Sequence, residues 1–127
     1  MTSRASIVFR LERRLDKVMR GFDVGVSAAI ARDMVTFQGH FQVSKIDDDL
    51  PERYHFKPLT FKKKPPYRLC EVYLAPNGQY RGVVMFPPRR AEAWWVYAFK
   101  KQRPIDRPKI AIARARADEL WDLLQRS

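Results

Sequence analysis

The dipeptide Asn77-Gly78 lies between two runs of alternating residues, and it constrains the fold of this 127-residue chain more than any other feature. The run before it covers residues 67–74, and the run after it covers residues 80–86. Both turn residues tolerate positive φ, so Asn-Gly between two such runs is a strong signal of a β-hairpin. The sequence therefore predicts two antiparallel strands joined by a tight turn.

A third strand follows this hairpin. Pro87 and Pro88 interrupt the pattern, because proline cannot donate a hydrogen bond within a sheet. Residues 93–99 come next and are rich in aromatic side chains, which favour strands. Residues 67–99 are therefore predicted to form an antiparallel meander of three or more strands.

Helical periodicity occurs on both sides of the meander. In residues 1–39, apolar residues recur at helical spacing in two stripes, which predicts a pair of helices, the second ending at Gly39. The segment Ile7-Val8-Phe9 is equally compatible with a short strand, so both alternatives stay open there. Residues 106–126 predict a C-terminal helix, with Asp106 as its N-cap and Pro108 in its first turn.

Residues 40–66 lose the helical period and contain several prolines, which predicts a basic connector. One short extended piece is expected in it, near residues 56–61. The whole order is a helix pair, a connector, a meander and a final helix. It predicts a single α+β domain over residues 1–127, with helices packed on an antiparallel sheet.

The charge of the chain indicates its class of partner. Its formal net charge is +11, which predicts binding to nucleic acid or to the ribosome. Cys70 is the only cysteine, so the chain forms no intrachain disulfide, cysteine-based zinc site or redox pair, as fits a reducing cytoplasm. No run approaches the roughly 18–20 apolar residues that span a bilayer, so we expect a cytoplasmic protein without membrane contact. His40 and His55 have no third ligand at suitable spacing, and we expect neither a metal nor a cofactor.

Several short motifs occur in a characteristic order: Tyr67-Arg68-Leu69, Tyr80-Arg81-Gly82, the run VYAFKK at residues 96–101, a proline, and a basic helix that ends in Ala117-Asp118-Glu119-Leu120. In this order, residues 67–120 resemble the RelE/ParE superfamily of bacterial toxins, and most closely its HigB-like, phage-derived branch. For residues 1–66 the resemblance is only architectural. Members of this superfamily are the toxins of toxin–antitoxin pairs. Many cut mRNA in the ribosomal A site, whereas the ParE-type branch poisons DNA gyrase.

The resemblance implies a RelE-like fold and a type II toxin that cleaves mRNA on the ribosome without metal or cofactor. The implied partners are the ribosome, mRNA and an antitoxin, expected to be a helix-turn-helix protein encoded nearby. Cleavage by the RNA's own 2′-hydroxyl needs a base, cations for the phosphorane and an acid for the 5′-oxygen. By resemblance, Arg81 matches the strand arginine that holds the scissile phosphate. Lys100 and Lys101 match the basic pair at the end of the third strand.

Other cations are predicted to bind the backbone of mRNA or ribosomal RNA, namely Arg68, Lys62, Lys63, Lys64, Arg89 and Arg90. The tyrosine or histidine that family members often carry near the start of the last helix is absent, since Arg107, Pro108 and Lys109 stand there. The candidates for the missing acid or base are Tyr80, Tyr97, His40 and His55.

This departure from the family pattern leaves two alternatives open. One is a ParE-like toxin that acts on DNA gyrase and is not a nuclease. The other is a basic module that binds nucleic acid and performs no chemistry.

Overall fold

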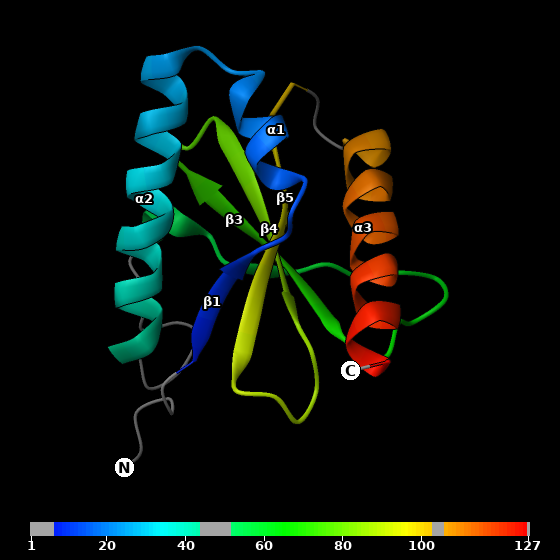
Figure 1. The fold of residues 1–127 in the computed structure, drawn as a ribbon. Coiled ribbons are helices and arrows are strands. Elements are labelled where there is room, and N and C mark those ends of the chain that lie inside the picture. The colour runs from blue at the N-terminus through cyan, green and yellow to red at the C-terminus, as the bar shows by residue number, and fades with distance from the viewer. Residues whose placement is uncertain (1–6, 44–51, 103–105, 127) are drawn as a thin grey trace.

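The computed structural model describes residues 7–43, 52–102 and 106–126 (Figure 1). Its elements, in chain order, are β1 (Val8–Leu11), α1 (Leu15–Arg20), α2 (Val24–Val43), the 3-10 turn η2 (Glu52–Tyr54), β2 (Lys57–Pro58), β3 (Arg68–Leu74), β4 (Tyr80–Phe86), β5 (Glu92–Lys100) and α3 (Arg107–Gln125). The predicted α+β class, the three strands of the meander and the C-terminal helix are confirmed.

The five strands form one sheet in the order β1-β5-β4-β3-β2. The meander β3, β4 and β5 is antiparallel and occupies its centre. β2 extends it antiparallel to β3, within the region where an extended piece was expected. β1 pairs parallel to β5, with Arg10 opposite Trp94, so the sheet is mixed rather than purely antiparallel.

The turn at Asn77-Gly78 has the predicted conformation. Asn77 has a φ of 55° and Gly78 a φ of 68°, and the amide of Gln79 donates to the carbonyl oxygen of Pro76 at 3.0 Å. Positive φ is costly for most residues but not for glycine, and asparagine tolerates it. These two residues therefore reverse the chain between β3 and β4.

The N-terminal part differs from a simple helix pair. Of the two alternatives for Ile7-Val8-Phe9, the strand is confirmed, because β1 begins at Val8 and α1 is only six residues long. The predicted end of the second helix at Gly39 is wrong, since α2 continues to Val43. Phe41 is buried in the core beyond this glycine. Burial of a large aromatic side chain outweighs the roughly 1 kcal/mol that a glycine costs inside a helix.

Helices cover both faces of the sheet, and each face has its own core (Figure 1). The face under α1 and α2, called the α2 face below, buries Trp95, Val72 and Val84 together with Phe37 of α2. The face under α3, called the α3 face, buries Val83, Met85 and Val96 together with Ala113, Ala117 and Leu120 of α3. A bulge in β5 leaves Val96 unpaired, since Val83 pairs with Tyr97 and Val84 with Trp95. Residues on either side of this bulge therefore keep their faces despite the break in alternation.

Among the helices of the described ranges, none combines the length and apolar character that crossing a bilayer requires.

Gly82 of β4 marks the tightest approach on the α2 face, and we expect Gly82→Ala to destabilise the fold. A β-carbon there would stand 2.5 Å from Cζ3 of Trp95 and 2.9 Å from Cδ1 of Leu74. The Trp95 ring is buried, and its Nε1 donates to Oε1 of Gln38 at 3.0 Å, so it has little freedom to move. Overpacking of this kind costs about 1–3 kcal/mol in unfolding free energy, measurable by urea denaturation.

The matched control is Gly39→Ala in α2, where a β-carbon meets no atom within 4 Å. Replacing a glycine inside a helix by alanine stabilises by about 0.5–1 kcal/mol, so the two variants are expected to move in opposite directions. Equal effects would show that the space around Gly82 is not the constraint.

Candidate functional site

Arg81 is a cation on the α3 face whose side chain is almost entirely covered. Its residue is 6% exposed, and its partners in the sheet are Tyr73 of β3 and Phe99 of β5. The guanidinium carbon lies 3.4 Å from the centroid of the Tyr73 ring, which makes a cation–π contact. Nη1 donates a hydrogen bond to the carbonyl oxygen of Gly78 in the hairpin turn. These contacts fix the direction of the guanidinium.

Arg81 also lacks an anionic partner. In residues 7–43, 52–102 and 106–126, no carboxylate forms an ion pair with it. Its Nε is buried without a hydrogen-bond acceptor among those residues. Buried charges are rarely left unpaired, because removing them from water is expensive. An oriented guanidinium without a carboxylate is suited to bind a phosphate group, which accepts hydrogen bonds from its N–H groups.

Tyr73 lies at the centre of a small cluster of basic side chains, one of which is Arg81. Nζ of Lys57 donates to the Tyr73 hydroxyl at 2.9 Å and lies 5.0 Å from the ring centroid. The His55 ring lies against the same tyrosine, with 4.7 Å between the ring centroids. Lys57 pairs with Glu71 in the sheet, which places it on the α3 face together with Tyr73. Three basic side chains from β2, β4 and the residues before β2 thus surround one phenol; we call Arg81, Tyr73, Lys57 and His55 the Tyr73 cluster.

The cluster changes the acidity of Tyr73. The hydrogen bond from Lys57 lowers the pKa of the Tyr73 hydroxyl below its ordinary value, since it stabilises the phenolate. Partial burial opposes this effect, and the positive charges of Arg81 and Lys57 reinforce it. Tyr73 is therefore a stronger acid than a tyrosine in water.

Lys101 lies near the cluster but has a carboxylate of its own. Its amide donates to the carbonyl oxygen of Gln79 at 2.8 Å, which continues the pairing of β5 beyond Lys100. Nζ of Lys101 lies 3.0 Å from Oδ2 of Asp106, which is buried at the start of α3. Asp106 occupies the predicted N-cap position, but its side chain makes no capping hydrogen bond. Its carboxylate instead binds the lysine at the end of β5.

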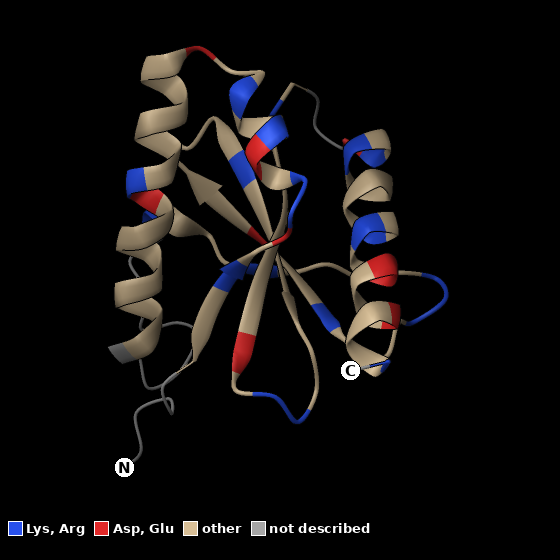
Figure 2. Ribbon diagram, in the orientation of Figure 1, with Lys and Arg blue, Asp and Glu red and all other residues tan. Residues whose placement is uncertain are grey.

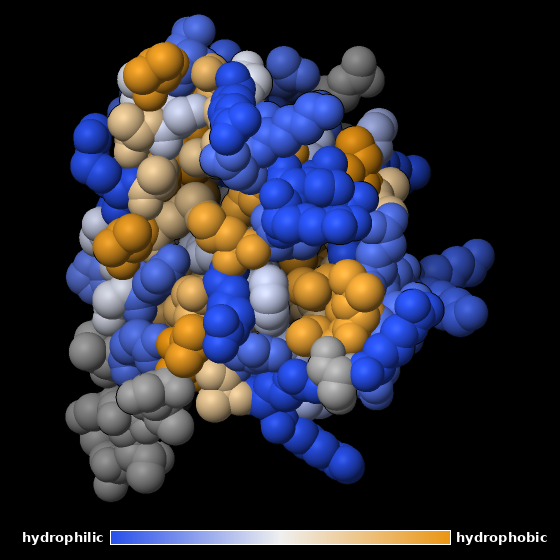
Figure 3. Space-filling view, viewed as in Figure 1, coloured by the Kyte–Doolittle hydropathy of each residue, from blue (hydrophilic) through white to orange (hydrophobic). Residues whose placement is uncertain are grey.

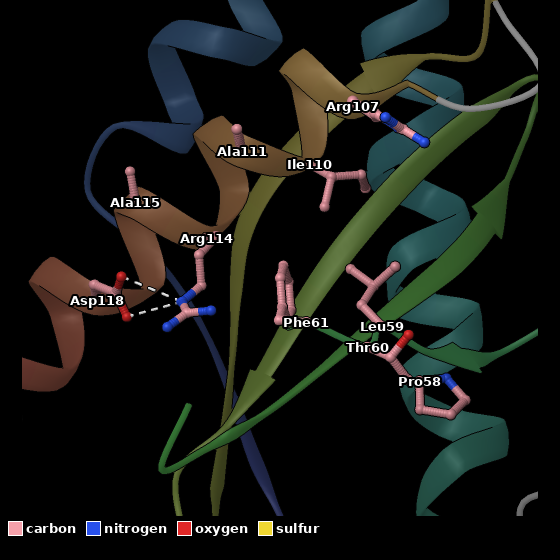
Figure 4. A pocket seen from close by; sticks show the side chains of 10 residues that line it. All are labelled: Pro58, Leu59, Thr60, Phe61, Arg107, Ile110, Ala111, Arg114, Ala115 and Asp118. Atoms are coloured by element: carbon pink, nitrogen blue, oxygen red, sulfur yellow. Dashed lines mark hydrogen bonds and ion pairs between the residues drawn. The ribbon is translucent and has the colours of Figure 1, made fainter. Parts of the chain in front are cut away.

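A groove runs beside α3 and is drawn in Figure 4. It encloses about 810 Å³ between the chain at residues 58–61 and one side of α3, from Arg107 to Asp118. Apolar side chains such as Ile110 and Phe61 form its walls. Arg114 lies 4.9 Å from the Phe61 ring centroid and binds Asp118 at 3.1 Å. The groove combines flat apolar surface with guanidinium groups, as single-stranded nucleic acid requires.

Some residues proposed from the sequence lie away from the Tyr73 cluster. Lys100 pairs with Tyr80, whose ring contacts Phe22, so both belong to the α2 face. Tyr97 is buried under α3, with the guanidinium of Arg116 5.0 Å from its ring centroid. His40 lies beside Tyr54, also on the α2 side of the sheet.

The remaining cations proposed from the sequence lie towards the end of the sheet that is opposite the Tyr73 cluster. Arg68 pairs with Phe86 where β4 ends, and Arg89 and Arg90 follow in the loop to β5. Arg90 donates to the carbonyl oxygen of Leu124 in α3 at 2.9 Å. The loop with Lys62, Lys63 and Lys64 contacts α3, because Arg114 of this helix donates to the Lys63 carbonyl oxygen at 3.2 Å. In Figure 2 the Lys and Arg residues of both loops are blue, and both loops lie away from the N-terminal end of α3.

A buried carboxylate positions the chain that carries His55 and Lys57. Asp33 of α2 is 6% exposed and accepts hydrogen bonds from Nη2 and Nη1 of Arg53 at 2.6 and 3.2 Å. It also accepts from the Tyr54 hydroxyl at 3.2 Å and from the Ala75 amide at 2.7 Å. This network ties α2 to η2 and to the end of β3. His55 follows η2 directly, in the left-handed region with a φ of 44°.

Of the residues proposed from the sequence, the structure brings Arg81 and His55 together. Sequence reasoning did not propose Tyr73, Lys57 or Asp33 for the site. The alternation of β3 was a usable signal, because it places Tyr73 on one face with Glu71. Within the described parts of the chain, no group of three or more His, Cys, Asp or Glu residues is placed to hold a metal ion.

We expect Asp33→Ala to destabilise the fold by about 2–3 kcal/mol, because it leaves the Ala75 amide and the Tyr54 hydroxyl without their acceptor. Arg53→Ala serves as the comparison and is expected to cost less than Asp33→Ala, since it keeps the hydrogen bonds of Asp33 to Tyr54 and the Ala75 amide, and the half-exposed Arg53 side chain is screened by solvent. Thermal and urea unfolding measure both. If Arg53→Ala were the more damaging change, the ion pair and not the buried acceptor would hold this network.

The tyrosines are expected to ionise in a defined order. Lys57 lowers the pKa of Tyr73, whereas burial raises the pKa of Tyr54 to about 12 and raises that of Tyr67 as well. Tyr73 should therefore lose its proton at a lower pH than Tyr54 and Tyr67. An alkaline titration followed by phenolate absorbance measures this, and Tyr73→Phe should remove the earliest phase. Lys57→Met should shift that phase to higher pH.

No model of a known protein family matches the sequence, and no curated protein matches it. Among solved structures, a chain of the archaeal RelE–RelB complex from Pyrococcus horikoshii OT3 is similar, with a TM-score of 0.52 and 8% sequence identity. The match covers 78% of the present chain and 99% of that chain. At this identity the likeness concerns the fold, and the expectation of a RelE-like α+β fold is confirmed.

Proposed function

We propose that this chain is the toxin of a type II toxin–antitoxin pair and that it cleaves mRNA on the ribosome by attack of the RNA's own 2′-hydroxyl. Within the RelE/ParE superfamily, the motifs in residues 67–120 favour the HigB-like branch. The observation that carries the proposal is Arg81, a covered and oriented guanidinium with no carboxylate partner among the described residues. The RelE-like fold supports it as well.

The reaction needs positive charge where negative charge develops. Arg81 would hold the scissile phosphate and stabilise the phosphorane oxygens, and the rest of the Tyr73 cluster supplies groups that exchange protons. The groove beside α3 would receive the neighbouring nucleotides, since Phe61 offers a face for stacking and Arg107 a charge for phosphate. The lysines at 62–64 and Arg89 and Arg90 would add contacts to ribosomal RNA.

An antitoxin is proposed as the second partner. The similar chain from Pyrococcus horikoshii was solved in a RelE–RelB complex. In the present chain, β1 is an edge strand, and its Val8 and Leu11 are more than half exposed. Figure 3 shows hydrophobic patches between hydrophilic ones on this face of the molecule. An exposed edge with apolar side chains is suited to pair with a partner strand, and a net charge of +11 favours an acidic partner.

A basic module that binds nucleic acid without chemistry is the second candidate. It is favoured by the ion pair between Lys101 and Asp106, which neutralises one of the two lysines that the family resemblance places on the phosphate. Lys100, the other, lies on the α2 face. The experiment below distinguishes the two functions.

We expect induced expression of the wild type to arrest growth and to produce new mRNA 5′ ends within translated frames, and Arg81→Ala to abolish both. The loss of one phosphate-binding guanidinium from a catalytic site lowers the rate by about 10²–10³-fold. Mapping of mRNA 5′ ends shortly after induction measures the cleavage. The matched control is Arg32→Ala, which removes an exposed arginine from α2 and should leave the new ends unchanged.

Arrest without such ends would contradict the nuclease proposal and point to DNA gyrase or another target. No arrest, together with salt-sensitive RNA binding, would leave the inert module as the function.

A further inference from the structure

We infer that Tyr73 is a catalytic residue that donates a proton to the 5′-oxygen as the phosphodiester bond of the RNA breaks. The inference rests on the proposed function and deepens it. It identifies Tyr73 as the general acid, since the start of the last helix has no tyrosine or histidine that could act as one.

The hydrogen bonding of Tyr73 leaves its proton available. Lys57 donates to the Tyr73 oxygen at 2.9 Å, and an ammonium group has no lone pair with which to accept in return. The phenol proton must therefore point to a different acceptor. Within the described ranges, no side chain or carbonyl group accepts a hydrogen bond from the Tyr73 hydroxyl. The 5′-oxygen of a bound RNA strand is such an acceptor.

Tyr73 also stands where the phosphate is expected. The guanidinium of Arg81 lies against its ring at 3.4 Å, so an anion held by Arg81 comes within reach of the same tyrosine. The other four tyrosines do not share this place. Tyr80 faces Phe22 and Tyr97 lies under α3, while Tyr54 and Tyr67 donate to Asp33 and Asp118.

The surroundings of Tyr73 suit an acid. Lys57 and Arg81 lower the pKa of its hydroxyl, which strengthens it as a proton donor. Lys57 would also stabilise the phenolate that remains after proton transfer, since it already donates to that oxygen.

The step balances without any further reactant. The 2′-oxygen attacks phosphorus and forms the new P–O bond, and its proton passes to a ring nitrogen of His55, whose ring lies against Tyr73. The bond from phosphorus to the 5′-oxygen breaks, and that oxygen takes the proton of Tyr73. The products are a 2′,3′-cyclic phosphate and a 5′-hydroxyl. Water then returns a proton from His55 to Tyr73.

The test compares two mRNAs on programmed ribosomes. One has the normal linkage at the cleavage site, and in the other a sulfur atom replaces the bridging 5′-oxygen. A thiolate leaves without being protonated, so this substrate does not need the acid. We expect Tyr73→Phe to slow cleavage of the normal mRNA by about 10²–10³-fold and to leave cleavage of the sulfur-containing mRNA nearly unchanged. His55→Gln should slow both, because its role precedes bond breaking.

Equal slowing of both mRNAs by Tyr73→Phe, or no slowing of either, would overturn the acid role. The wild type separates this from failure of the proposed function: if it cleaves neither mRNA, the nuclease proposal falls and the inference falls with it. Thermal unfolding of Tyr73→Phe shows that the variant is folded. Lys57→Met gives a second readout: the fall of the cleavage rate at alkaline pH should move to higher pH, because the pKa of Tyr73 rises when its donor is lost.

Discussion

The buried carboxylate of Asp33 is the interaction on which the geometry of the site depends. It accepts four hydrogen bonds, two from Arg53 and one each from Tyr54 and the Ala75 amide. The bond from Tyr54 is buried, and those from Arg53 and Ala75 are partly buried. Because the Arg53 side chain is about half exposed, solvent screens its ion pair, and we expect the bonds from Tyr54 and the Ala75 amide to contribute more of the stability. Since η2 leads into His55 and Lys57, and Ala75 follows Tyr73 by two residues, one acceptor on the α2 side sets the relative position of both parts of the Tyr73 cluster.

Successive residues of strand β4 contribute to different faces of the sheet, one to the core on the α2 face and the next to the candidate site on the α3 face. Gly82 allows the Trp95 ring and Leu74 to close over the α2 face, while its neighbour Arg81 points to the α3 face. Covering a guanidinium costs free energy, and the contact with the Tyr73 ring and the bond to the Gly78 carbonyl offset part of it. The remaining cost is what an arriving phosphate would relieve. The tight packing on one face and the arrangement of Arg81 with Tyr73 on the other therefore depend on neighbouring residues of the same strand.

The central meander and α3 were predictable from the sequence, because turn chemistry and periodicity both act over a few residues. Asn77-Gly78 favours positive φ, which both residues adopt here, and the apolar stripe of α3 repeats along the helix. The assignment of β1 was open because its four residues are a strand only through pairing with β5, far along the chain. The end of α2 was misplaced for the same reason: burial of Phe41 is a tertiary effect that overrides the local preference of Gly39.

The site was less predictable, because it depends on register and on which charges are paired. A two-residue loop at Asn77-Gly78 would pair Leu74 with Arg81, whereas the longer loop of the structure pairs Tyr73 with Arg81. A shift of one residue moves every side chain of a strand to the other face, and no local pattern reveals it. The same alternation separates Lys100 from Lys101, although they are adjacent in the chain. Net charge is no guide either. Lys101 and Arg114 are cations with carboxylate partners, while Arg81 has none among the described residues. On the function proposed above, one phosphate would therefore bind at a covered arginine that has no carboxylate partner among the described residues, and not at the loops that carry several lysines and arginines.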